Sequence, residues 1–295
     1  MVQQKVQLRK VRDFGENLND TFQFIRQEFK PLAGSFILFA GVFILAQSII
    51  AGLFQGKMFA FLDDFKNGMY TKQPTDAYSA IFTPQYFLLI ICSFLSIVAM
   101  RVTVACYMKL YDEKQASPTI REVWILFSRQ YLKNVVFSIP VLLITIISIF
   151  FCFFPVVYFA IVFAPFQFIV VSEGVSFGDA FSRCFTLIKE NFWISFGIYI
   201  LTYIIYLTGS SIIGFFIGAL IGIASYFTTN EISSTVGIVT SAVSAIAYLF
   251  YIIFFVSVGM HYYNLAERAD GTGMARRLEN LGKNTNPNEN IEEQY

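Results

Sequence analysis

Few side chains in this sequence have the types and spacing that catalysis or metal binding requires. The chain has one histidine, His261, and its four cysteines form no CxxC pair. A metal site or a cysteine nucleophile needs several such side chains in a defined arrangement. No GxSxG, HExxH or GxxxxGKS/T motif occurs in a usable context. We therefore expect no catalytic residue, no metal site and no cofactor.

The other candidates are polar side chains inside long apolar stretches. Arg101 is the only clearly intramembrane charge, and an ionisable group within a membrane span often contacts a substrate or a buried partner. Arg101 lies only eight residues before Lys109, however, so its guanidinium could instead extend to the membrane interface. Gln47 and Gln167 are expected to form hydrogen bonds between helices. These two residues and Arg101 form the candidate intramembrane polar site.

The elements that must position these residues are membrane helices. Hydrophobic residues make up 56% of the chain and charged residues only 14%, whereas soluble domains carry about 25% charged residues. Several uncharged stretches exceed the roughly 18 apolar residues that a transmembrane helix needs. The sequence therefore predicts an all-α polytopic membrane protein whose first partner is the lipid bilayer. The net charge of +1 argues against nucleic acid as a partner.

Six spans are predicted, arranged as three helical hairpins in a membrane domain at 31–266. The uncharged stretch 134–172 has 39 residues, and as one helix it would be about 58 Å long, nearly twice the hydrocarbon thickness of about 30 Å. Two spans joined by a turn near Pro155 fit better. Residues 1–30 form a tail with an amphipathic helix, and 267–295 form a polar tail with a disordered end. The six spans are placed at about 32–54, 82–108, 135–153, 156–171, 192–222 and 236–260.

An amphipathic segment precedes each hairpin. In the first, at 16–30, apolar residues recur at spacings of four, three and four, which predicts one apolar stripe on a helix. The stripe consists of Leu18, Phe22, Ile25 and Phe29. The sequence RQEFKPLAGSF at 26–36 is similar to RQYLKNVVFSI at 129–139, before the second hairpin. We predict three repeated units, each an interfacial helix followed by a transmembrane hairpin.

The third amphipathic segment is the best defined, and it reads VSEGVSFGDAFSRCFTLIKENFW from Val171 to Trp193. Ser176 and Asp179 have the spacing of a helix cap. Glu173 and Arg183 are expected to form an ion pair that fixes the amphipathic helix to span four. We interpret the segment as a structural joint made by Glu173, Gly174, Ser176, Asp179, Arg183 and Trp193.

The same stretch resembles bacterial six-span integral membrane proteins related to the membrane domain attached to some glycerophosphodiester phosphodiesterases. The resemblance rests on the acid–glycine pair that ends span four, on residues 180–183, and on Trp193. It implies a six-span membrane domain. The phosphodiesterase activity is not expected to carry over, because that family's soluble catalytic barrel is missing from this sequence and its chemistry uses more than one histidine.

Small residues recur at every fourth position on spans five and six. This spacing lets helices approach closely. We predict that span five packs on span six through these faces, and a contact between two copies of the chain is the alternative. The residues are Gly214, Gly218 and Gly222 on span five and Gly237, Ser241 and Ala245 on span six.

The distribution of basic residues predicts the orientation. Six spans put both termini on one side, which then carries 17 Lys and Arg residues, against Lys57, Lys66 and Lys72 on the other. Loops rich in Lys and Arg face the cytoplasm. We therefore expect a protein of the bacterial inner membrane with both termini in the cytoplasm.

These observations favour a non-enzymatic membrane protein that acts as a scaffold or accessory subunit in an envelope process. Protein partners would bind at the cytoplasmic face, and an oligomer is possible. The alternative is a transporter or channel for a small or lipid-like solute, lined by spans two, four and five near Arg101.

The orientation can be tested by cysteine labelling in a cysteine-free background. Single cysteines placed in 57–76 are expected to react with a membrane-impermeant maleimide added to intact cells, because this loop lies outside. Cysteines in 267–295 should react only after lysis. The reverse pattern would contradict the predicted orientation.

Overall fold

The computed structural model describes residues 5–66, 82–151, 153–228 and 245–275, and these residues form helices and no strands. Six stretches of the described residues are long and apolar enough to cross a membrane, which confirms the predicted all-α, six-span architecture. The helices are α1 (Phe14–Phe39), α2 (Gly41–Lys66), α4 (Pro84–Lys114), α5 (Ile120–Ile149), α6 (Phe153–Val162), α7 (Phe166–Glu173), α8 (Phe177–Lys189), α9 (Phe192–Thr228), η1 (Tyr248–Phe250) and α11 (Tyr251–Asp270).

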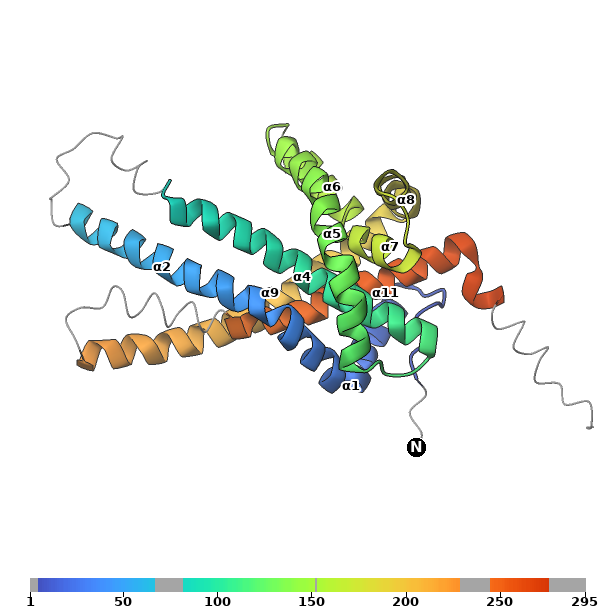
Figure 1. Cartoon of the computed structure of the whole chain (residues 1–295), viewed down its shortest axis with the longest axis horizontal. Coiled ribbons are helices and arrows are strands. Elements are labelled where there is room, and N and C mark those ends of the chain that lie inside the picture. The colour runs from blue at the N-terminus through green and yellow to red at the C-terminus, as the bar shows by residue number, and fades with distance from the viewer. Residues whose placement is uncertain (1–4, 67–81, 152, 229–244, 276–295) are drawn as a thin grey trace, which may run out of the picture.

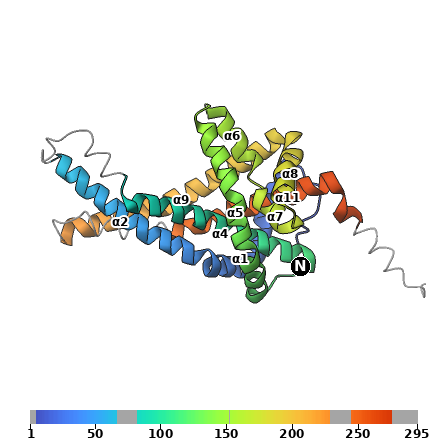
Figure 2. The ribbon, with the colours of Figure 1, turned by 45° about the horizontal axis from the view of Figure 1, so that its top comes forward.

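The helices diverge from one closely packed end of the molecule. Helix α2, the first half of α4 and α9 extend in one direction, and α5 and α6 form a separate hairpin that points away from them (Figures 1 and 2). At the other end, α1, α7 and α11 pack around the second half of α4, and α8 packs on α7 and α11. The packed end is termed the base, and it comprises residues 5–32, 98–127, 166–190 and 255–275. The remaining helical segments are termed the arms.

Burial separates the base from the arms. Every residue of α4 from 98 to 108 except Arg101 is buried, and so is every residue of α11 from 255 to 267. On the arms, large apolar side chains face outward, and the side chain of Phe150 is 85% exposed. Exposed apolar side chains of this kind suit contact with lipid, where burial among protein side chains gives little additional stabilisation. The core of the molecule therefore lies in the base.

Helix α1 turns its polar face inward. The predicted apolar stripe faces outward at Phe22 and Phe29, and the side chain of Phe29 is 56% exposed. The buried positions of the first four turns are Asn17, Thr21, Phe24 and Glu28. This arrangement arises because polar groups of the base need polar partners on α1. The apolar side chains of the stripe could not form hydrogen bonds with them.

The three amphipathic segments differ in how they join their spans. Helix α1 continues through Pro31 to Phe39, and the candidate span that follows it is Gly41–Met58; the predicted span at 32–54 stays a prediction. The second segment is the beginning of α5, which runs without a break through Pro140. Only the third is a separate helix, α8, since Gly174 with φ +70° ends the preceding helix and α9 begins after Asn191. The third segment contains a residue that ends a helix, Gly174, and the second segment has no such residue.

The long stretch 134–172 folds into two helical parts, as predicted. Helix α5 ends at Ile149 and α6 begins at Phe153, so Pro155 lies in the first turn of α6 and not in the turn itself. Proline is well tolerated there because the first N–H groups of a helix have no partner within it. Pro165 separates α6 from α7 within the candidate span Phe154–Glu173.

The predicted packing of span five on span six through small residues stays a prediction, because Gly237 and Ser241 lie outside the described residues. A Cβ atom built on Gly214 or Gly218 would meet nothing within 4 Å, so no other helix of the described chain approaches them. Among the described residues, α9 approaches η1 closely at Gly209, where a Cβ atom would lie 2.7 Å from the Phe250 ring. Ala245 packs against the core. The side-chain surroundings of Gly222, and both Gly237 and Ser241, lie outside what the structure describes.

The closest approach inside the base is at Gly259 of α11. A Cβ atom there would lie 2.5 Å from Met108 Sδ and 2.6 Å from Phe168 Cε1. We expect Gly259→Ala to destabilise the protein by about 1–3 kcal/mol, because both neighbours must shift. Gly214→Ala is the matched control and should be neutral or stabilising by up to about 1 kcal/mol, since alanine favours helix and the site is open. Thermal unfolding in one detergent compares the two variants, and equal midpoints would contradict this packing.

Candidate functional site

The predicted joint forms around an ion pair between Glu173 and Arg183. Arg183 Nε lies 3.4 Å from Glu173 Oε1, which confirms the predicted pair. The hydroxyl of Tyr262 on α11 donates to the same carboxylate oxygen over 3.0 Å. Arg183 also pairs with Asp270 at the end of α11. The joint therefore connects α7, α8 and α11, whereas the sequence indicated only a connection between neighbouring segments.

The charge of Arg183 is secured by these partners. Burial would lower the pKa of its guanidinium, but the carboxylates of Glu173 and Asp270 outweigh this effect and raise the pKa above its ordinary value. The cation is therefore present at every physiological pH. Through its two carboxylate partners, Arg183 holds α8 to α7 and α11 within the base.

Two lysines complete the joint from other helices. Lys109 Nζ donates to the Val171 carbonyl over 2.9 Å, and Lys133 Nζ donates to the Val175 carbonyl over 3.0 Å. Carbonyl groups near a helix C-terminus lack helical partners and carry partial negative charge, so a lysine is well placed there. The N-terminus of α8 is capped by Ser176, whose Oγ accepts from the Asp179 N–H over 3.4 Å. Trp193 is 78% exposed, and its ring lies beside those of Phe192 and Phe196 on α9.

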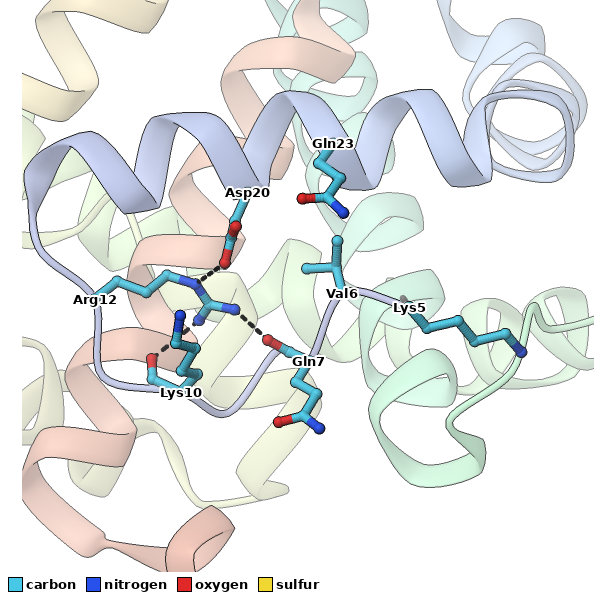
Figure 3. Close-up of a pocket in the computed structure, with 7 residues that line it drawn as sticks. All are labelled: Lys5, Val6, Gln7, Lys10, Arg12, Asp20 and Gln23. Carbon is cyan, nitrogen blue, oxygen red and sulfur yellow. Dashed lines mark hydrogen bonds and ion pairs between the residues drawn. The ribbon is translucent and has the colours of Figure 1, made fainter. Parts of the chain in front are cut away.

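Residues 5–13 form a strap across the base, although the sequence indicated only a cytoplasmic tail. Arg12 is 1% exposed, and its guanidinium donates to Asp20 Oδ2 over 2.7 Å and to the carbonyl groups of Gln7, Leu8 and Lys10 (Figure 3). The backbone of Arg12 is held by the amide of Asn264, which accepts from Arg12 N over 2.9 Å and donates to Arg12 O over 3.2 Å. The strap therefore links α1 to α11.

Arg9 fixes the strap to two further elements. Its Nε lies 2.9 Å from Asp112 Oδ2 on α4, and its Nη1 donates to Thr272 Oγ1 over 2.8 Å. Gly273 approaches the strap so closely that a Cβ atom there would lie 2.8 Å from the Arg9 carbonyl oxygen. Basic residues near a terminus usually indicate a solvated tail, so no signal in the sequence separated this strap from such a tail.

Beside Arg12 lies an open polar cavity of about 250 Å³. Its lining residues are Lys5, Val6, Gln7, Lys10, Arg12, Asp20 and Gln23 (Figure 3). Arg12 and Asp20 are engaged with each other, and the Lys5 side chain extends away from them (Figure 3). The cavity thus presents amides and a lysine to solvent, and its lining contains no nucleophile paired with a base.

A buried carboxylate joins α1 to α4. Glu28 accepts from the Tyr107 hydroxyl over 2.6 Å and from Ser117 Oγ over 2.9 Å. Only 4% of Glu28 is exposed, so these bonds replace its hydration. Glu28 lies outside the predicted apolar stripe of α1, and its inward position explains the orientation of that helix.

At the boundary between base and arms, the structure brings together two of the three predicted intramembrane residues. Arg101 Nη1 donates to Gln167 Oε1 over 3.4 Å, and Gln167 Nε2 donates to Ser138 Oγ over 3.0 Å. The guanidinium carbon of Arg101 lies 5.6 Å from the centroid of the Phe255 ring. Four helices, α4, α5, α7 and α11, meet at this point. These four residues are termed the boundary cluster.

Gln47, the third predicted residue, lies elsewhere. Its Nε2 donates to the hydroxyl of Tyr248 over 2.7 Å, and this bond connects α2 to η1. The interhelical hydrogen bonds predicted for Gln47 and Gln167 are therefore confirmed.

A serine–histidine contact that the sequence did not indicate joins α9 to the base at α11. Ser195 Oγ and His261 Nε2 are 2.8 Å apart, although the residues are separated by 66 positions in the chain. Both side chains are fully buried. A nucleophile needs access to its substrate, and no cavity is described at this pair. Among the described residues, no three His, Cys, Asp or Glu side chains gather as a metal site would require.

No family model, no curated protein and no solved structure matches the chain. The resemblance to the membrane domain of glycerophosphodiester phosphodiesterases therefore stays a prediction.

The importance of the strap can be measured by replacing Arg12. Arg12→Met is expected to destabilise the protein by about 3–5 kcal/mol, because it leaves the Asp20 carboxylate and three carbonyl groups without their buried partner. Lys10→Met is the matched control from the same cavity. Its ion pair with Glu16 is exposed and 3.8 Å long, so the change should stay within about 0.5 kcal/mol. Unfolding midpoints, together with proteolysis of residues 1–13 in the folded protein, test both expectations; equal behaviour of the two variants would contradict the role of the strap.

Proposed function

We propose that this chain is a non-enzymatic integral protein of the bacterial inner membrane that acts as a scaffold or accessory subunit. The observation that carries the proposal is the base, where salt bridges and hydrogen bonds between distant segments hold the strap, α1, α4, α8 and α11 in one fixed arrangement. A scaffold requires such rigidity, because partners must meet a defined surface.

The state of the reactive groups supports a structural role. The Ser195–His261 contact is sealed from solvent, and the Glu173–Arg183 pair is bound on both sides by α11. Catalytic groups are usually held in a cleft where a substrate can reach them. The open cavity beside Arg12 contains no such group.

The position of the charges supports cytoplasmic termini. The described parts of the strap and of the region after α11 both belong to the base (Figure 1). Among the described residues, the Lys and Arg side chains counted for the cytoplasmic side lie in or next to the base, and the lysines of α2, counted for the other side, lie elsewhere. A concentration of Lys and Arg at one end of a membrane protein favours the cytoplasmic side for that end.

Helix α8 provides the surface that a cytoplasmic partner would meet. Its apolar side chains, including Cys184 and Leu187, face the base, and its polar residues face outward. Burial raises the pKa of the Cys184 thiol, so this cysteine serves as a small apolar side chain. Ser182 and Lys189 lie on the outward face, which is polar and contains no large apolar residue.

The second candidate, a transporter or channel for a small or lipid-like solute, is supported by the boundary cluster. A charged side chain between spans commonly marks the path of a solute. Arg101, Gln167 and Ser138 come from three different spans, as a solute site would require.

The two functions can be separated by site-specific photo-crosslinking in cells. A photoreactive residue at Ser182 is expected to give protein adducts of reproducible size, because α8 faces the cytoplasm. The control position is Ile49 on α2, which is 64% exposed on an arm and should give only lipid adducts. Absence of protein adducts at Ser182, combined with solute flux in reconstituted vesicles that is lost in Arg101→Ala, would overturn the scaffold and favour transport.

A further inference from the structure

We propose that Arg101 and Ser138, oriented by Gln167, bind a phosphate oxyanion at the boundary cluster. The inference goes beyond the proposed function and does not depend on it. A phospholipid headgroup of the leaflet next to the base is the source that the surrounding residues favour, and free phosphate is the other source of the same chemistry.

The first argument is the unbalanced charge of Arg101. Its guanidinium carries five N–H groups, and its one hydrogen bond within the described chain is the 3.4 Å contact with Gln167. None of the ion pairs among the described residues includes Arg101. A guanidinium inside a membrane span needs an anion or a path to water. Most of its donor groups are therefore available to a ligand.

The second argument is access. Arg101 is partly exposed, although the neighbouring residues from Val98 to Met108 are buried. It lies 13 residues before Lys114, at the end of α4, and this corresponds to about 20 Å along the helix axis. Lys109 lies nearer that end, but it is committed to the Val171 carbonyl. Arg101 is consequently the cation that a ligand at the boundary can reach.

The third argument is the supply of donors around it. Gln167 is 3% exposed and uses both ends of its amide, since its oxygen accepts from Arg101 and its nitrogen donates to Ser138 Oγ. The Ser138 oxygen is thus an acceptor in this bond, and its own O–H remains able to donate. The cluster therefore combines the guanidinium fork of Arg101 with the hydroxyl of Ser138, which is 4% exposed, and both are oriented by one buried amide. Phosphate accepts hydrogen bonds in this geometry, and arginine binds it in a bidentate manner.

The fourth argument favours a lipid as the source. Ile97 lies one turn from Arg101 on α4, and Leu142 lies one turn from Ser138 on α5; both are further from the base, and both are more than one third exposed. Residues four apart lie on the same face of a helix. Polar donors near the base with exposed apolar side chains beyond them match a headgroup and its acyl chain.

The test measures lipid binding by the full-length protein in detergent, with native mass spectrometry. The probes are phosphatidylglycerol and a diacylglycerol that carries glucose in place of phosphoglycerol. Wild-type protein should bind phosphatidylglycerol more tightly, and Arg101→Gln should weaken this binding about tenfold while leaving the glucosyl lipid unaffected. Arg129→Gln is the matched control, because Arg129 is an exposed arginine on α5 outside the cluster. It should bind both lipids as wild type does.

Inorganic phosphate distinguishes the sources. Stabilisation of the lipid-free protein by millimolar phosphate that disappears in Arg101→Gln would assign the site to a soluble anion, whereas an effect of phosphatidylglycerol alone would assign it to a lipid. Equal binding of phosphatidylglycerol by wild type and Arg101→Gln, without any effect of phosphate, would overturn the proposal. If Arg101→Gln does not fold, Gln167→Met takes its place. It removes the orienting amide at similar length, and unchanged binding in this variant would overturn the proposal equally.

Discussion

The packing of the base depends on pairs of charged groups, in which the side chains of Arg12 and Asp112 are almost fully removed from water. Arg9 with Asp112 and Arg183 with Asp270 connect segments that are distant in the sequence, and Arg12 with Asp20 and Arg183 with Glu173 connect neighbouring segments. In lipid, apolar side chains gain little by leaving the solvent for a protein interior, so polar contacts and close fit carry more of the helix association. Removing one partner of a buried pair leaves the other charge uncompensated. The cost of an uncompensated charge therefore favours one arrangement of the helices over others, because a wrong helix register would separate these pairs.

The shape of the molecule follows from the same constraint. Where polar pairs are dense, α4 and α11 are buried on all sides; where they end, α2, α9 and the α5–α6 hairpin diverge (Figure 1). Contacts along the arms are made by aromatic pairs, single hydrogen bonds such as Gln47 to Tyr248, and the close approach at Gly209. Each such contact fixes two neighbouring helices and leaves the others free to face lipid.

The features predicted from the sequence are those that local patterns determine. Uncharged stretches gave the six spans, and the short distance between Glu173 and Arg183 in the chain gave their ion pair. The strap, the inward polar face of α1 and the Ser195–His261 contact depend on partners that lie far away in the sequence. Periodicity finds the two faces of a helix, but it does not show whether water, lipid or another polar segment will meet each face. For α1 the partner is a polar base, so Phe22 and Phe29 of the stripe are exposed, while Leu18 and Ile25 are only partly buried against the core.

Arg12 and Arg101 have very different surroundings. Arg12 has a carboxylate and three carbonyl groups around a guanidinium that is 1% exposed, which is the arrangement expected for a structural cation. Arg101 has one long bond to a neutral amide, an aromatic ring and an open side. A fold that satisfies one arginine so completely places no comparable set of acceptors around the other in the described residues. The difference argues that Arg101 faces an anion from outside the chain, because the bilayer interior alone would not tolerate its charge.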